Sequence, residues 1–125
     1  MDPSSFSSDA AWHHVCGLYA DPALAAELLR RQDQQGLDVV LHLFALWAAQ
    51  QGRPLDAAAL AQADAHVARW RQEVIAPLRR LRRAMKAMDE AQAGAGAATR
   101  RQLQAAELAA ERAELELLCA WLRER

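Results

Sequence analysis

The chain has 125 residues, of which 53% are hydrophobic, and its 15 basic and 16 acidic side chains give a formal net charge of −1. This size and apolar content suit one compact domain. The longest strongly apolar run, Val39 to Ala49, is well short of the ~20 residues that cross a bilayer, and the first residues lack the basic and apolar regions of a secretory signal. We therefore expect a soluble cytoplasmic protein that makes no membrane contact.

The two cysteines of the chain, Cys16 and Cys119, lie inside helical patterns. Two such distant thiols are typical of buried free cysteines in a reducing compartment rather than of a disulfide framework.

Apolar residues recur at helical spacing along almost the whole chain, which predicts an all-α protein. We expect a disordered tail over residues 1–8 and a single helical domain over residues 9–125, folded as a bundle of about five helices. The first, short helix is indicated by apolar side chains at positions i, i+3, i+4 and i+7, namely Trp12, Val15, Cys16 and Tyr19. A serine before it, or Asp9, can cap this helix.

The second and third helices are marked by their ends. Asp21 followed by Pro22 is a capping residue with proline at the first helical position, and Gly36 ends that helix. Asp38 can cap the third helix, and Gly52 follows its end. The third helix is apolar on all sides, so we expect it to be the central and most buried one.

The fourth helical region begins near Asp56 and carries an apolar line at seven-residue intervals, which predicts a long helix packed against the last one. The line consists of Leu60, Val67, Val74, Leu81 and Met88. Pro77 lacks an amide hydrogen and should kink or restart this helix. The stretch from Asp89 to Ala98 is rich in alanine and glycine and is predicted to be a flexible connector. The last helix is expected from about Thr99 to about Leu122.

Basic side chains are concentrated between Arg69 and Lys86, where seven basic residues accompany one acid. This stretch carries a net charge of +6, whereas the residues before it carry −5. Such a cationic stretch requires an anionic counterpart, which is a partner macromolecule, a phosphate ligand or the protein's own carboxylates. If the counterpart is a partner, we expect Arg79, Arg80, Arg83 and Lys86 to contact it.

Three carboxylates of the last helix, Glu107, Glu111 and Glu114, fall between two apolar arcs on a helical wheel. Drawn as one continuous helix, the fourth region places Arg71 in a similar apolar setting. We favour a structural interpretation, in which Arg71, together with Arg79 or Arg82, pairs with these carboxylates across two packed helices. The alternative is a pocket for a polar ligand or for acid–base chemistry.

Asp38 and His42 lie one helical turn apart on the apolar third helix. The carboxylate could orient the imidazole toward a ligand or a proton. We favour the simpler interpretation, in which Asp38 caps the helix and His42 bonds to a backbone carbonyl.

Motifs with a known chemistry are absent from the sequence. There is no CxxC, HExxH, GxGxxG, GxxxxGK[ST] or GxSxG pattern, so we expect no metal and no cofactor and identify no catalytic residue. Our first interpretation is a helical protein that binds a partner protein, or a second copy of itself, through residues 69–86. The first alternative is a ligand-binding or catalytic bundle around the polar cluster. Nucleic-acid binding is the second alternative, disfavoured because Trp70 alone is aromatic in the basic stretch and the chain is nearly neutral.

Several segments, taken in their order along the chain, resemble those of a family of small bacterial proteins catalogued as domain of unknown function 2390. The most specific ones are QD-x-x-G-x-DV before the apolar helix and W-x-x-x-V-I-x-PLR-x-LR in the basic stretch, and the likeness runs from about Trp12 to Leu122. Members of that family often have Asn at the position of Val40 and Leu at that of His42. The resemblance implies an all-helical bacterial protein with no established activity.

Overall fold

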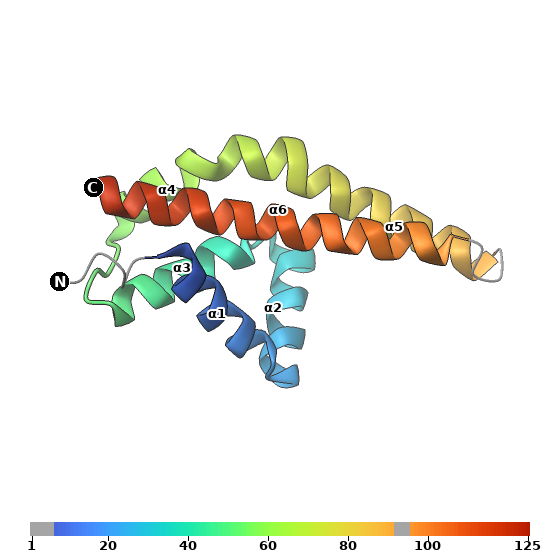
Figure 1. The fold of residues 1–125 in the computed structure, drawn as a ribbon, viewed down its shortest axis with the longest axis horizontal. Helices are drawn as coiled ribbons and strands as arrows, with labels where there is room; N and C mark the ends of the chain where they lie inside the picture. Colours follow the sequence, from blue (N-terminus) through green and yellow to red (C-terminus); the bar gives the residue numbers. More distant parts are fainter. Residues whose placement is uncertain (1–6, 92–95) are drawn as a thin grey trace. The chain divides into compact units, whose positions relative to one another are not determined.

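The computed structural model of the chain describes residues 7–91 and 96–125, and these contain helices but no strand. The helices are α1 (Ser8–Tyr19), α2 (Pro22–Gln35), α3 (Val39–Gln50), α4 (Ala57–Trp70), a π-helical turn (Arg71–Ile75), α5 (Ala76–Ala91) and α6 (Ala97–Glu124) (Figure 1). The helix α4, the π-helical turn and α5 follow one another without a break. They form the long fourth helix of the prediction, and the all-α class with five helices is confirmed.

Residue contacts divide the chain into two compact units. The first unit comprises Met1–Val67 and Leu115–Arg125, and the second comprises Ala68–Glu114. The long fourth helix and α6 each contribute to both units. The expected single domain over residues 9–125 stays a prediction, and each unit is considered by itself below.

Capping side chains begin the helices of the first unit where the sequence predicts them. The Ser7 hydroxyl accepts a hydrogen bond from the amide of Ala10, so α1 begins within the predicted tail. Carboxylates do the same for the next three helices, because Asp21, Asp38 and Asp56 accept from the amides of Ala23, Leu41 and Ala59. Gly36 and Gly52 follow α2 and α3 with φ angles of 67° and 80°, a left-handed conformation that glycine adopts without strain.

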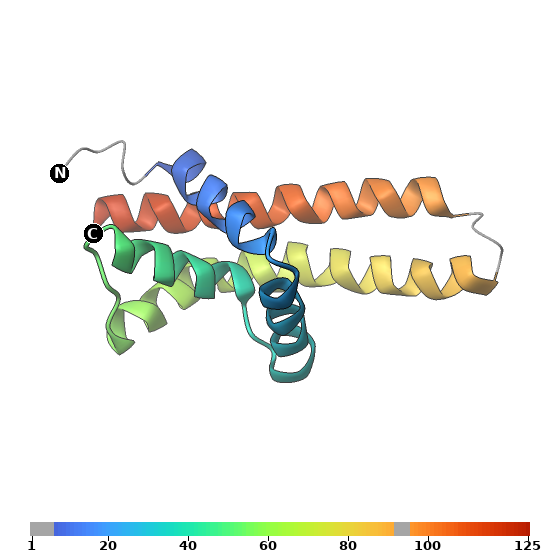
Figure 2. The same cartoon turned by 90° about the horizontal axis from the view of Figure 1, so that it is seen from below.

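The core of the first unit is centred on α3, as predicted. Val40, Leu43, Phe44 and Trp47 are each at most 3% exposed. The helices α1 and α2 pack against α3, and the end of α6 adds Leu115, Leu118 and Leu122 to the same buried cluster (Figure 2). Leu46 is 48% exposed, so α3 keeps one narrow side toward solvent.

The expected burial of both cysteines is half right. Cys119 is fully buried, and loss of hydration raises the pKa of its thiol to about 11. Cys16 is exposed, because the buried side of α1 is formed by Ala11 and Val15 instead.

The seven-residue apolar line does not form a continuous buried seam. Val67 is buried, whereas Leu81 is 50% and Met88 55% exposed. Leu60, before the π-helical turn, is 38% exposed as well. Beyond Val67 the line is broken by this turn, where the amide of Ala76 donates to the carbonyl of Arg71, five residues back. One extra residue in a turn rotates all later side chains by about 100° around the helix axis. Pro77 follows this turn, so the helix restarts at the predicted place.

The predicted connector over Asp89 to Ala98 is too long at both ends. The helix α5 continues to Ala91 and α6 begins at Ala97, since alanine, acidic residues and glutamine are compatible with helix. The remainder, residues 92–95, and residues 1–6 of the predicted tail lie outside the described part of the chain.

We predict that Phe44→Ala lowers the free energy of unfolding by about 3–5 kcal/mol, because it removes a fully buried ring from the core. Denaturant unfolding measures this change. Leu46→Ala is the matched control on the same helix and should cost less than about 1 kcal/mol, since half of that side chain is already in water. Equal losses for the two variants would contradict the assignment of α3 as the centre of the core.

Candidate functional site

The second unit is an antiparallel helical hairpin. The π-helical turn and α5 form one arm and residues 97–114 of α6 form the other, and the two arms lie side by side (Figure 2). Ile75 and Ala110 are buried, as are the side chains of Glu107 and Glu114. The indole nitrogen of Trp70 donates a 2.9 Å hydrogen bond to the carbonyl of Ala110 and joins the arms at one end.

Two ion pairs cross the seam of the hairpin. The Nε atom of Arg82 donates to a carboxylate oxygen of Glu107, whose side chain is 8% exposed. One turn away, a guanidinium nitrogen of Arg79 lies 3.6 Å from a carboxylate oxygen of Glu111. A carboxylate in a dry seam is costly unless a cation answers it. The prediction that cations face Glu107 and Glu111 from the fourth helix is therefore confirmed for Arg82 and Arg79.

Arg71, which we predicted from the sequence to be the main partner of these carboxylates, lies half-buried on the π-helical turn. Glu114 is 1% exposed, as expected from its position between apolar arcs, and its Oε2 atom accepts no hydrogen bond from the described residues. Pairing of Arg71 with the carboxylate cluster stays a prediction. The sequence analysis ranked Arg71 above Arg82 because it drew the fourth region as one regular helix, and the π-helical turn changes which residues after Ile75 face α6.

The four predicted contact residues do not behave alike. Arg80, Arg83 and Lys86 are exposed on α5. Arg79 is only 14% exposed and turns inward to Glu111, so it is not presented with the other three. Contact of these residues with a partner stays a prediction.

The ion pair of Arg79 with Glu111 lies at one side of the seam between α5 and α6. The exposed cations of α5 lie on that same side of the hairpin. On α6, helical geometry places Arg101 and Leu108 on the same side of the hairpin as Glu111, and both are exposed. We call this side the basic face and define it as Arg80, Arg83, Lys86, Arg101 and Leu108. Four of its five residues are cationic and Leu108 is apolar; the sequence has no acidic residue from Ala76 to Met88 or from Ala97 to Ala106, and Asp89 and Glu90 follow Met88.

The third helix offers a cap rather than a reactive pair. An Asp38 carboxylate oxygen accepts a 3.1 Å hydrogen bond from the amide of Leu41. His42 lies half-buried on the first turn of the same helix. The capping interpretation of Asp38 is thus realised in the structure.

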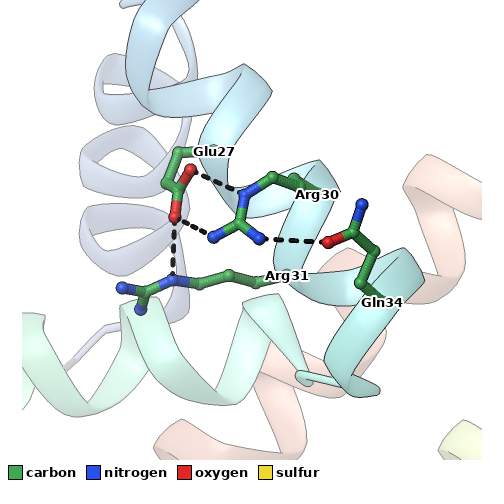
Figure 3. Close-up of polar contacts among 4 residues, drawn as sticks. All are labelled: Glu27, Arg30, Arg31 and Gln34. Atoms are coloured by element: carbon green, nitrogen blue, oxygen red, sulfur yellow. Dashed lines mark hydrogen bonds and ion pairs between the residues drawn. The ribbon is translucent and has the colours of Figure 1, made fainter.

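Sequence reasoning missed a polar cluster on α2, drawn in Figure 3. The Glu27 carboxylate accepts two hydrogen bonds from Arg30, of 2.6 and 3.0 Å, and a third of 3.2 Å from Arg31. Arg30 also donates to the side-chain oxygen of Gln34. The hydrogen bonds and the positive charge of Arg30, and then those of Arg31, lower the pKa of Glu27 from 4.5 to about 2. The i, i+3 and i, i+4 spacing in the sequence could have indicated this cluster.

An open hollow beside the π-helical turn is lined by Arg69, Trp70, Glu73 and Val74. Arg69 and Glu73 bond to each other at 2.8 Å, and the Trp70 indole is bound to Ala110. The polar groups of the hollow are therefore already engaged, and it is a weak candidate for a ligand site.

Within residues 7–91 and 96–125, no three His, Cys, Asp or Glu side chains are grouped so that they could hold a metal ion. None of the helices described combines the length and the apolar character needed to cross a membrane.

Comparison with known proteins gives one result. A family model described as "Protein of unknown function (DUF2390)" matches residues 10–118. Neither the curated proteins nor the solved structures that were compared contain a significant match.

We predict that Arg82 and Glu107 are energetically coupled by about 1–3 kcal/mol, as expected for a partly buried contact pair. A double-mutant cycle of Arg82→Met and Glu107→Gln, followed by denaturant unfolding, measures the coupling. The control cycle replaces Arg82→Met with Arg80→Met, on the exposed side of α5, and should give a coupling near zero. Similar values in the two cycles would show that the pair does not hold the seam.

We predict that the Glu27 carboxylate titrates near pH 2 in the folded protein, because Arg30 and Arg31 stabilise its charged form. Since the folded pKa lies below the ordinary value, the contact stabilises the fold above pH 4.5, and this contribution disappears as the pH falls toward 2. Carboxyl NMR titration measures the midpoint. Arg30→Met should raise it toward 4.5 and Arg31→Met should raise it less; no shift in Arg30→Met would refute the assignment.

Proposed function

The chain belongs to the DUF2390 family of proteins of unknown function, and we propose that it acts by binding a partner protein through the basic face of its helical hairpin. The observation that carries this proposal is the sorting of cations on α5. Arg79 and Arg82 are committed to Glu111 and Glu107, whereas the side chains of Arg80 and Lys86 are exposed. Solvent-exposed cations fit an acidic surface.

A protein fits this face better than a nucleic acid does. Leu108 is 55% exposed among the cations, and an apolar centre with a polar rim is typical of protein interfaces. Single-stranded nucleic acids require aromatic platforms, and the only tryptophan of the second unit, Trp70, is half-buried with its indole bound to a backbone carbonyl. The overall charge of −1 also opposes a phosphate-rich ligand.

The alternative of a ligand-binding or catalytic bundle receives less support. It depends on Arg71, Glu107, Glu111 and Glu114 lining a pocket, and two of these carboxylates are bound to Arg82 and Arg79 in the seam. We therefore retain the structural role for the cluster.

We also assign the protein to the cytoplasm as part of this proposal. Both of its cysteines are free, and the Cys16 thiol is exposed. An exposed free thiol persists most readily in a reducing compartment.

The test is affinity capture from the native cell with the full chain, compared with Arg80→Gln/Lys86→Gln. The proposal predicts that this variant loses an acidic protein partner, and that binding of the original chain weakens as salt shortens the screening length from ~10 to ~3 Å. Arg30→Gln/Arg31→Gln has the same net charge and changes only α2, so it should retain the partner.

Other outcomes separate the alternatives. Loss of binding in both variants alike would indicate charge without a specific face, and nuclease-sensitive capture would favour nucleic acid. If Glu107→Gln abolished binding without lowering stability, the cluster would be a site.

A further inference from the structure

The two arginines that cross the seam of the hairpin each directly follow a leucine in the sequence. The order is Leu78-Arg79 and Leu81-Arg82, within the stretch PLRRLRR. Both arginines reach carboxylates of α6, whereas Leu81 is 50% exposed and Leu78 is half-buried. A shift of α5 by one residue would therefore exchange arginine for leucine at both positions of the seam.

The π-helical turn sets the present phase of α5. Its hydrogen bond joins the amide of Ala76 to the carbonyl of Arg71, five residues back instead of four. Every later residue consequently lies where its predecessor would lie in a regular α-helix. If the turn closed to a regular α-helical turn, α5 would rotate by about 100°. Each of the two leucines would then take the place that the arginine after it holds now.

Two features hold the π-helical turn open. In a regular α-helix the ring of Pro77 clashes with the carbonyl four residues back, which is that of Glu73, and the wider turn spans Glu73. The second feature is the charge on Glu107 and Glu111. After closure these carboxylates would face leucine instead of arginine, and a carboxylate that loses its cation in a dry seam is strongly destabilising.

Burial of apolar surface favours the closed turn. Leu81 is 50% and Met88 55% exposed, and they lie two turns apart on one side of α5. The rotation would carry this side toward α6, so both side chains would lose contact with water. At the same time Arg79 and Arg82 would leave the seam, and α5 would present more cations to solvent.

We infer that α5 is a rotational switch with two registers against α6. In the ionic register, which the structure shows, the π-helical turn is open and Arg79 and Arg82 face the carboxylates. In the apolar register the turn is α-helical, and the leucine before each arginine faces α6. Charged Glu107 and Glu111 hold the first register, and their neutralisation favours the second because an uncharged group needs no cation. This inference does not depend on the proposed function, since no partner enters it.

Thiol labelling of a cysteine at residue 88 tests the switch. The full chain carries Met88→Cys together with Cys16→Ser, which removes the exposed native thiol. Adding Pro77→Ala, Glu107→Gln and Glu111→Gln removes both features that hold the turn open. Labelling at residue 88 should then slow by about tenfold, the drop expected when the exposed register falls to about a tenth of the population. Pro77→Ala alone keeps the ion pairs and should slow labelling less.

Ala87→Cys is the matched control in the same backgrounds. Ala87 is exposed now, and after closure it would take the place that Met88 holds now, which is also exposed. Its labelling rate should therefore stay the same, and circular dichroism verifies that all variants are folded. A rate at residue 88 that is unchanged or faster after the three added substitutions would overturn the inference, as would equal slowing at residues 87 and 88.

Discussion

The arrangement of the hairpin depends on cations that neutralise the carboxylates buried in its seam. Glu107 and Glu114 are nearly inaccessible to water, and a charge in that position is strongly destabilising without a cation. Arg82 and Arg79 meet this need for Glu107 and Glu111. Because each guanidinium must reach its carboxylate, the pairs set both the height and the rotation of α5 relative to its neighbouring arm.

The π-helical turn determines which arginines are available for the seam. Its extra residue rotates everything after Ile75 around the helix axis, so Arg79 and Arg82 turn inward while Leu81 and Met88 turn outward. Pro77, which cannot donate a backbone hydrogen bond, directly follows this wide turn. One local irregularity thus decides which of the described side chains of α5 face α6 and which face solvent.

The two units are stabilised by different physical means. The first has an apolar core around α3, to which Phe44, Trp47 and the end of α6 contribute. The second has a seam of ion pairs and few buried apolar residues. Ion pairs specify register more than they add stability, so the hairpin has well-defined faces and little core. That combination suits a surface for association.

The sequence by itself determined the features that rest on local rules. Caps at Asp21 and Asp38, the glycine ends of α2 and α3, the burial of α3 and the presence of carboxylates among apolar residues were all predictable, because each depends on neighbours within one or two turns. Only the tertiary structure decided that Cys16 is exposed, that Arg79 is turned inward toward Glu111 and that several residues of the seven-residue apolar line are exposed to solvent. These outcomes depend on which element covers each face and on a turn that breaks the constant rotation of about 100° per residue, and a helical wheel contains neither.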